Sequence, residues 1–262
     1  MSSEMNNQVV LVTGASKGIG LACVERFAQA GARVVGVSRS ADNLAQAAEA
    51  LAAKGLKMAA SHAVDLTDPA AATAMVDQIE LETGPIAVLV NSAGAARRFT
   101  PDEINAAAFR QGMDAKYFTY VHVLEPVIHR MVSRSSGSIV NIIGQGGKQA
   151  GVLHLAGGAA NAALMLSTVG FARAYADRGV RVNAINPGLT RTSRVDANFE
   201  AAARASGRPM AELLDEELAR IPMRRMAEPS EIAEVAYFLA SPRASYVSGV
   251  LIPMDGCTTS VI

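Results

Sequence analysis

A chain of 262 residues is long enough for one large α/β domain or two small ones. Half of its residues are hydrophobic and 18% are charged, which allows a substantial core and argues against global disorder. The 24 basic residues balance the 24 acidic ones, and this balance excludes the basic excess that is typical of a nucleic-acid-binding protein.

The two cysteines, Cys23 and Cys257, lie at opposite ends of the chain, and their number gives no support for a disulfide framework. A reduced cytosolic compartment fits them better, with Cys23 packed on a helix as a small hydrophobic residue. Residues 1–8 lack the apolar core of a signal peptide, and the longest apolar runs fall well short of the ~20 residues that a membrane helix requires. We therefore expect a soluble, cytoplasmic protein with no nucleic-acid or membrane partner and no metal ion.

Short apolar runs alternate with longer stretches of helical pattern, which predicts an α/β fold in which helices cover both faces of a parallel sheet. Seven strands are expected, at residues 9–12, 33–37, 57–64, 86–90, 138–143, 180–185 and 250–254. Helices are expected at residues 21–30, 42–54, from Asp68 onward, 107–134, 158–178 and 230–240. Residues 192–225 interrupt this rhythm and are predicted to form a helical lid. Without a linker or a repeat, residues 1–262 are expected to form one domain.

Three glycines, Gly14, Gly18 and Gly20, come directly after the first predicted strand. Glycines let the backbone turn sharply and let a phosphate approach without a Cβ in the way. A helix that begins near Gly18 points its free N–H groups and the positive end of its dipole at that phosphate. An ordinary strand–turn–helix connection also uses glycines, but the position straight after the first strand favours a dinucleotide site.

The segment from Thr13 to Gly20 resembles the signature of the short-chain dehydrogenase/reductase family, and the resemblance extends over the whole chain. Four further segments are similar to motifs of that family, in order and spacing: Asp65-Leu66, Asn91-Ser92-Ala93-Gly94, Arg181 to Gly188 with Thr192, and Ser248-Gly249 with Asp255-Gly256. The resemblance implies a Rossmann-type doubly wound sheet of seven strands, an oxidoreductase that uses a nicotinamide cofactor, and a homotetramer.

The predicted cofactor contacts follow from the glycine turn and from this resemblance. They are Gly14, Ser16, Lys17, Gly18, Ile19, Gly20, Ser38, Arg39, Asp65, Leu66, Asn91, Ala93, Gly94, Asn161, Pro187, Gly188 and Thr192. The end of the second strand bears on which nicotinamide cofactor binds. An acidic residue there normally binds the ribose hydroxyls of NAD, whereas an arginine suits the 2′-phosphate of NADP. Arg39 offers a planar fork for phosphate and Lys17 adds a second cation, so the residues favour NADP(H) over NAD(H), although both cations are also compatible with a solvated surface.

Members of this family usually carry an Asn-Ser-Tyr-Lys tetrad, in which the tyrosine hydroxyl exchanges a proton with the substrate oxygen and the lysine lowers the pKa of that hydroxyl. Without a gap, the four positions fall on Lys116, Gly144, Gly157 and Asn161. No tyrosine occurs between Tyr120 and Tyr175, so a shifted frame does not restore the tetrad. The resemblance therefore implies an atypical member with a non-standard active site.

Lys116 and His154 are the candidate proton donors, because the glycines at two of the tetrad positions have no group to move a proton. Burial or neighbouring cations lower the pKa of a lysine from its reference value of ~10.4, and a histidine titrates near neutral pH. Asn161 retains a hydrogen bond to a ribose hydroxyl but carries no charge. Alternatively, Lys116 fills the vacated space with a structural hydrogen bond to Asn161, and His154 is a packed or solvated loop residue. Tyr117 and Tyr120, on a helix nearby, are weaker candidates.

Three functions are compatible with these residues. The first is an NADP(H)-dependent oxidoreductase in which Lys116 or His154 replaces the tyrosine, and a small carbonyl or alcohol exchanges hydride with the nicotinamide. The second is a catalytically inactive NADP(H)-binding protein that senses the cofactor or stabilises a partner. The third is non-redox Schiff-base chemistry at Lys116. We expect the first.

The predicted lid bears on the substrate in two ways. Its apolar residues predict an apolar lining or, equally well, a packed helical face: Phe199, Met210, Leu213, Leu214 and Met223. Its arginines would favour an acidic substrate, although solvated arginines are the more usual case: Arg191, Arg194, Arg204, Arg208, Arg220, Arg224 and Arg225.

Overall fold

The computed structural model describes residues 5–94 and 96–260, and its seven described strands form one parallel sheet in the order β3-β2-β1-β4-β5-β6-β7. The strands are β1 (Val9–Thr13), β2 (Arg33–Ser38), β3 (Ala60–Ala63), β4 (Ile86–Asn91), β5 (Gly137–Ile142), β6 (Val180–Pro187) and β7 (Leu251–Met254). The predicted doubly wound α/β fold is confirmed. The third strand is shorter than expected, because residues 57–59 precede the ladder with β2.

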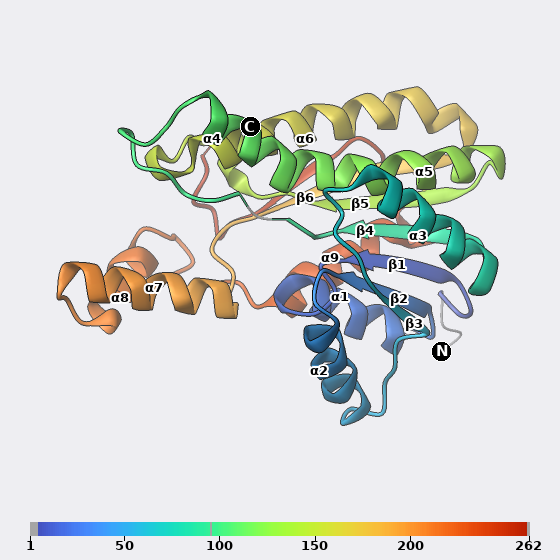
Figure 1. Ribbon diagram of the computed structural model, residues 1–262, viewed down its shortest axis with the longest axis horizontal. Coiled ribbons are helices and arrows are strands. Elements are labelled where there is room, and N and C mark those ends of the chain that lie inside the picture. The colour runs from blue at the N-terminus through green and yellow to red at the C-terminus, as the bar shows by residue number, and fades with distance from the viewer. Residues whose placement is uncertain (1–4, 95, 261–262) are drawn as a thin grey trace.

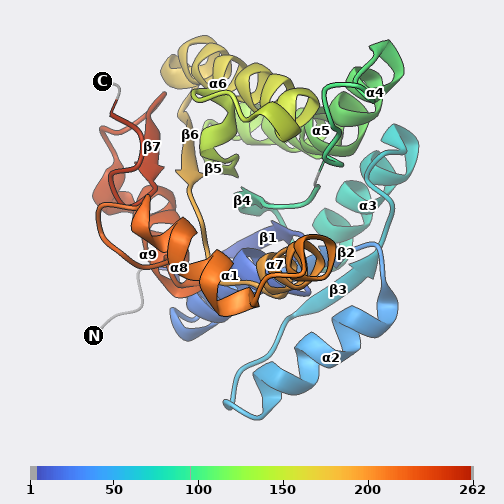
Figure 2. The same ribbon diagram turned by 90° about the vertical axis from the view of Figure 1, so that its left-hand side faces the viewer.

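Helices cover both faces of the sheet, as Figure 1 and Figure 2 show. One face carries α1 (Gly18–Gln29), α2 (Ala41–Ala52) and α9 (Pro229–Ala240), which share a core with the even-numbered residues of β1. The other face carries α3 (Pro69–Glu82), α5 (Thr119–Ser133) and α6 (Leu155–Tyr175). Residues of these helices share a second core with the odd-numbered residues of β1, Val9 and Leu11. Burial of both faces explains why β1 is a continuous apolar run rather than an alternating one.

The helical segment Val152–Arg178, which contains α6, is long and apolar enough to cross a membrane by length and composition, in contrast to the prediction that no apolar run is that long. A core helix of a soluble protein passes the same test, and α6 has buried residues such as Ala160 and Leu164 packed in the protein. Cys23 lies buried on α1, as predicted, and Cys257 is exposed; both are free thiols.

The strand order places a crevice at the edge of the sheet where the strands have their carboxyl ends. The chain leaves β1 toward β2 and β3 and returns on the other side as β4, so a crevice forms beyond the carboxyl ends of β1 and β4. The loops after these strands are tied together, because the N–H groups of Ser92 and Ala93 donate to Thr13 Oγ1 at 3.0 and 3.1 Å. Gly14 has φ +69°, and a Cβ on it would lie 2.9 Å from Ser92 O, so this approach requires glycine.

The helical region predicted at 107–134 divides into α4 (Ala106–Gly112), a π-helix (Met113–Phe118) and α5. A π-helical turn is frequent at functional sites. Gly94, with φ +95°, lets the loop after β4 lie against this turn, since a Cβ on Gly94 would lie 2.5 Å from Ala115 O. The π-helix therefore reaches the crevice, and Lys116 reaches it with the turn.

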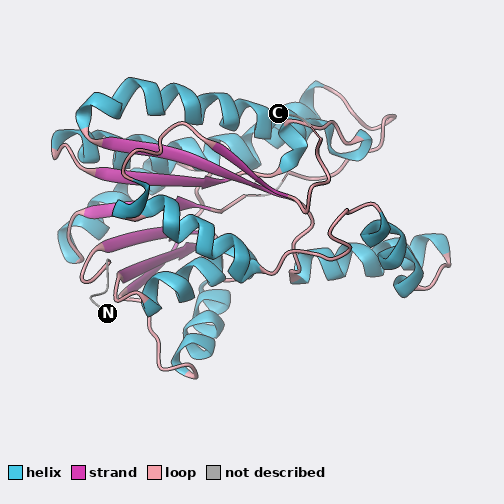
Figure 3. Ribbon diagram, turned by 180° about the vertical axis from the view of Figure 1, so that it is seen from behind, coloured by secondary structure: helices cyan, strands magenta, loops and turns pink. Residues whose placement is uncertain are grey.

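Two further helices, α7 (Ser193–Ser206) and α8 (Met210–Ala219), follow β6. Figure 3 shows them set to one side of the sheet, beyond its carboxyl edge. No residue of α8 is buried, and Met223, which follows it, is 64% exposed. The predicted helical character of residues 192–225 is confirmed, while the apolar side chains of α8 are only half-covered or exposed in this conformation.

Candidate active site

A cavity of about 920 Å³ lies in the crevice beyond β1 and β4. Fourteen of the predicted cofactor contacts line it: Gly14, Ser16, Lys17, Gly18, Ile19, Gly20, Ser38, Arg39, Asp65, Leu66, Ala93, Gly94, Pro187 and Thr192. Asn91, Asn161 and Gly188 are not among its lining residues. Asn91 instead supports the wall, because it accepts a hydrogen bond from Thr13 at 3.4 Å and donates one to Asn141 at 3.1 Å.

One end of the cavity is built for phosphate. Helix α1 is 12 residues long, and its N-cap residue, Lys17, makes no side-chain capping hydrogen bond. The first N–H groups of this helix and the positive end of its dipole are therefore free for an anion. Ser16 Oγ donates to Ser38 Oγ at 3.0 Å and ties the glycine turn to the end of β2. These residues fit the pyrophosphate of a dinucleotide.

The end of β2 presents cations rather than a carboxylate. Arg39 is exposed and lines the cavity together with Lys17. Asp65, across the cavity, accepts hydrogen bonds from the Thr67 N–H at 3.0 Å and the Thr67 hydroxyl at 2.9 Å. These bonds, with a smaller contribution from the positive charge of Arg39, hold the pKa of Asp65 below its ordinary value. The arrangement suits an adenosine ribose that carries a phosphate.

The other end of the cavity holds Lys116, whose side chain is 8% exposed. Its Nζ donates to Tyr120 Oη at 2.8 Å and to the Ile142 carbonyl at 3.3 Å. The Tyr120 hydroxyl donates to the same carbonyl. An ammonium has three N–H groups, so one remains for the cavity, which Lys116 lines together with Gly144. The alternative structural bond from Lys116 to Asn161 is absent among the described residues.

Burial sets the ionisation of this pair. It lowers the pKa of Lys116 to about 7, and the positive charge of Arg194 contributes to the same shift. Burial also raises the pKa of Tyr120, so its hydroxyl stays protonated and keeps donating to Ile142. Lys116 is therefore the group of this pair that exchanges a proton near neutral pH.

His154 occupies the space beside Gly157. It ends a short 3₁₀ turn (Val152–His154) just before α6, and a Cβ on Gly157 would lie 2.1 Å from His154 Cε1. His154 Nδ1 is buried without a hydrogen-bond partner in the described parts of the chain. Burial and the positive charges of Arg98 and Lys116 lower the pKa of His154, so its ring is neutral at neutral pH. His154 does not line the cavity.

The remaining tetrad positions lie close together. The amide nitrogen of Asn161, on α6, lies 3.4 Å from the place that a Cβ on Gly144 would take and 3.6 Å from that of Gly146. Tyr117 is hydrogen-bonded to Ser167 on α6 at 3.1 Å.

Neither the pairing of Lys116 with Tyr120 nor the place of Arg194 in the cavity was predicted from the sequence. The four-residue spacing of Lys116 and Tyr120, which brings two side chains to one side of a helix, was a signal for the first. The sequence carries no comparable signal for Arg194.

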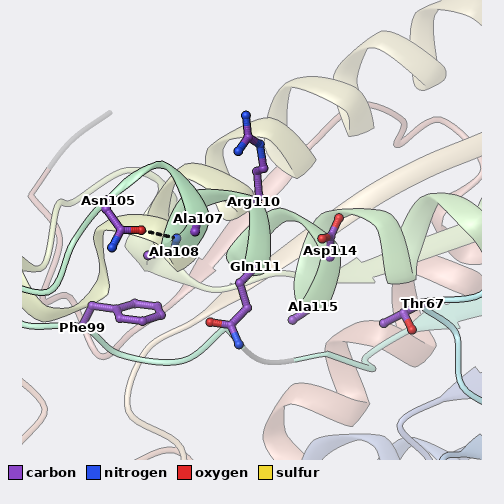
Figure 4. A pocket seen from close by; sticks show the side chains of 9 residues that line it. All are labelled: Thr67, Phe99, Asn105, Ala107, Ala108, Arg110, Gln111, Asp114 and Ala115. Atoms are coloured by element: carbon purple, nitrogen blue, oxygen red, sulfur yellow. Dashed lines mark hydrogen bonds between the residues drawn. The ribbon is translucent and has the colours of Figure 1, made fainter.

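A second, more open hollow of about 980 Å³ runs along α4 and the π-helix (Figure 4). Its lining includes Phe99, Arg110, Gln111 and Asp114, and it shares only Thr67 and Ala115 with the first cavity. None of the predicted site residues lines it, so we assign the chemistry to the first cavity.

Comparison with known proteins places this geometry among reductases and dehydrogenases. Residues 14–259 match the family described as Enoyl-(Acyl carrier protein) reductase. The chain is 38% identical to galactitol 2-dehydrogenase (L-tagatose-forming) of Cereibacter sphaeroides, over 97% of this chain and 95% of that one. It is 34% identical to cis-4-hydroxycyclohexanecarboxylate dehydrogenase of Sinomonas cyclohexanicum, over the full length of both. L-Sorbose reductase from Gluconobacter frateurii, solved with NADPH and L-sorbose, superposes with a TM-score of 0.92 at 29% identity and covers 100% of both chains.

The lowered pKa of Lys116 predicts a pH-dependent stability. Between pH 7 and ~10.4 the unfolded chain binds a proton at Lys116 that the folded chain does not, so folding becomes more favourable as pH rises through this window. Relative to Lys116→Met, the free energy of unfolding of the wild type should rise by about 3 kcal/mol between pH 6.5 and 9.5 in urea titrations. The exposed residue Lys148 supplies the control: Lys148→Met retains Lys116, so its free energy of unfolding should change with pH as that of the wild type does. A wild-type–variant difference that is the same at both pH values would contradict a lowered pKa.

Proposed function

Since the chain belongs to the short-chain dehydrogenase/reductase family, we propose that it is an NADP(H)-dependent oxidoreductase of a small carbonyl or alcohol, with Lys116 as the proton donor. The observation that carries this proposal is the position of the buried Lys116 amine. It lies on the wall of the same cavity that holds the glycine turn, with one N–H group free.

When bound, NADPH supplies a hydride from C4 of its nicotinamide. Lys116, in its ammonium form, donates a proton to the substrate oxygen as that oxygen gains negative charge, and the neutral amine takes a proton from an alcohol in the opposite direction. Tyr120 and the Ile142 carbonyl hold the amine in place, because they engage its other two N–H groups. A pKa near 7 leaves both forms of Lys116 populated at neutral pH.

Two observations favour Lys116 over His154 in this role. Lys116 lines the cavity, whereas His154 packs beside Gly157 behind it. The pKa of His154 is lowered from a value already below 7, so few molecules would carry a proton on the imidazole at neutral pH. We assign His154 the structural part of filling the space beside Gly157. Asn161 does not line the cavity, so a hydrogen bond from it to the cofactor ribose would need a shift of this part of α6 or of the loop after β5.

The atypical tetrad belongs to this proposal. Its four positions fall on Lys116, Gly144, Gly157 and Asn161. The contact of His154 with Gly157 supports this placement, because the His154 ring has taken the space of a side chain at position 157. In this proposal the Lys116 amine, on the π-helix, exchanges the proton that the tyrosine hydroxyl exchanges in other members of the family.

The cofactor preference and the substrate class draw support from the site and from relatives. Arg39 and Lys17 favour NADP(H) over NAD(H), and the similar L-sorbose reductase was solved with NADPH. The named substrates of the three relatives are a polyol, a sugar and a hydroxy acid, which supports a small hydroxyl or carbonyl compound.

We also propose one domain with residues 192–225 as a lid, a cytoplasmic location and a homotetramer. The homotetramer follows from the resemblance to the short-chain dehydrogenase/reductase family; Leu166 on α6 is 77% exposed and Tyr246 after α9 is fully exposed.

A catalytically inactive NADP(H)-binding protein is the second candidate, favoured by the glycines at positions 144 and 157, which have no group to move a proton. Tight NADPH binding without turnover across carbonyl and alcohol panels would favour it. Schiff-base chemistry at Lys116 is the third, and borohydride trapping followed by mass spectrometry tests it.

Replacement of the donor should slow the chemistry. Lys116→Met should lower kcat for carbonyl reduction by ~10²–10⁴-fold, the usual contribution of a general acid. For the wild type, kcat/KM in reduction should fall as pH rises through about 7, because the ammonium loses its proton. His154→Asn and Lys148→Met are the comparisons. If His154→Asn slows turnover more than Lys116→Met does, the donor is misassigned.

The cofactor preference is tested at the end of β2. Arg39→Ala should raise the Kd for NADPH by ~10–100-fold, the loss of charge-assisted hydrogen bonds to a phosphate, and leave the Kd for NADH unchanged. Arg33→Ala, an exposed arginine at the opposite end of the same strand, is the matched control. Equal effects on both cofactors in calorimetry would contradict a 2′-phosphate site at Arg39.

A further inference from the structure

Arg194 differs from the other arginines between Arg191 and Arg225. Five of them pair with carboxylates: Arg191 with Glu228, Arg204 with Glu200, Arg208 with Glu212 and Glu216, Arg220 with Glu217, and Arg225 with Glu231. Arg224 donates to the Ala219 carbonyl at 2.7 Å. Arg194 has no such partner in the described part of the chain. Its guanidinium is therefore available to a ligand.

Arg194 also lies where a substrate would bind. It stands on the first turn of α7 and lines the cavity together with Lys116, Thr119 and Gly144. Its charge reaches the proposed donor, because it contributes to the lowered pKa of Lys116. An anion between the two cations would be attracted by both.

The charges of the cavity are unequal. Its charged lining residues are four cations, Lys17, Arg39, Lys116 and Arg194, and one anion, Asp65. Arg39 follows β2 and Gly144 follows β5, and these strands are separated by β1 and β4. With about 4.8 Å between neighbouring strands, the two ends of the cavity are about 14 Å apart. The 2′-phosphate of the cofactor at Arg39 is therefore too far from Lys116 to pair with it, and the charge of Arg194 acts on Lys116 without an intervening anion.

We propose that Arg194 binds an anionic group of the substrate, a carboxylate or a phosphate ester, while the carbonyl or hydroxyl of the same molecule lies at Lys116. A guanidinium binds either anion through two parallel N–H groups. The inference rests on the proposed function, and it narrows the substrate from small alcohols in general to hydroxy acids, keto acids or their phosphate counterparts.

The competing ligand for Arg194 is the cofactor pyrophosphate. Thr192, two residues before Arg194, lies close to the glycine turn, since a Cβ on Gly18 would be 3.0 Å from Thr192 Cγ2. The two ligands predict different results, because a cofactor contact would affect NADPH binding and a substrate contact would not.

The experiment compares wild type, Arg194→Gln and Arg204→Gln. Arg204 is the matched control, because it lies on the same helix, is exposed and has its own carboxylate. The probes are hydroxy acids of three to seven carbons, the corresponding carboxamides, the corresponding phosphate esters, and polyols. Two quantities are measured: kcat/KM with NADP, and the Kd of each probe for the NADPH-loaded protein from the fluorescence of the bound nicotinamide.

In the wild type and in Arg204→Gln, at least one anionic series should bind with a Kd that is ~10–100-fold lower than that of the carboxamides. This is the range expected for a charge-assisted bidentate pair. Arg194→Gln should lose that preference with its Kd for NADPH unchanged, and added salt should reduce the preference in the wild type. The carboxylate and phosphate arms distinguish the two kinds of anion.

Three outcomes would overturn the inference: equal use of carboxamides and anions by the wild type, failure of every anion to bind, or a weaker NADPH affinity in Arg194→Gln with all substrates slowed alike. Selective binding of anions without turnover would support the assignment of Arg194 as an anion-binding residue. It would contradict only the proposed oxidoreductase function.

Discussion

The site depends on one buried amine held in a fixed position. Lys116 is fastened to Tyr120 Oη and to the Ile142 carbonyl, and both contacts are out of water. Burial without a carboxylate partner is costly for an ammonium, and the protein offsets this cost by lowering the pKa of Lys116 to about 7. The π-helix and Gly94 make the arrangement possible, because they bring this turn against the loop after β4. A group that would otherwise only destabilise the fold thereby becomes able to exchange a proton.

The cavity around this amine has two ends that differ in chemistry. At the glycine turn, the uncapped N-terminus of α1 and the cations Lys17 and Arg39 suit the phosphates of a dinucleotide. At the end of β5 and on the π-helix, Gly144 and the proposed proton donor Lys116 line the same cavity, and the charge of Arg194 contributes to the lowered pKa of Lys116. The strand order sets the separation of Lys116 from Arg39, so under the two proposals the cofactor and substrate charges are bound by different residues. This division explains how one cleft with four cations can still discriminate between ligands.

Most of the fold could be predicted from the sequence. Alternating apolar runs and helical stretches predicted the seven strands, and the glycines after β1 predicted the phosphate end, because both follow from local backbone and burial rules. Lys116 was singled out by its position in a family motif. The four-residue spacing to Tyr120 indicated one of its partners, whereas the contact with the Ile142 carbonyl joins segments far apart in the sequence and left no signal there. Three lid arginines, Arg204, Arg208 and Arg220, have a glutamate partner three or four residues away, which their spacing in the sequence indicates. Arg194 has no glutamate at that spacing, but only the tertiary structure shows that it lines the cavity.

The account rests on the protonation of Lys116, which can be observed directly. The chain has five lysines, so their side-chain signals can be followed one by one in an NMR titration of the folded protein, with Lys116→Arg to assign the resonance. We predict that the Lys116 signal titrates near pH 7, well below the ~10.4 of an unperturbed lysine. If all five titrate above pH 10, the buried amine is an ordinary ammonium at neutral pH and the proton-donor assignment is wrong.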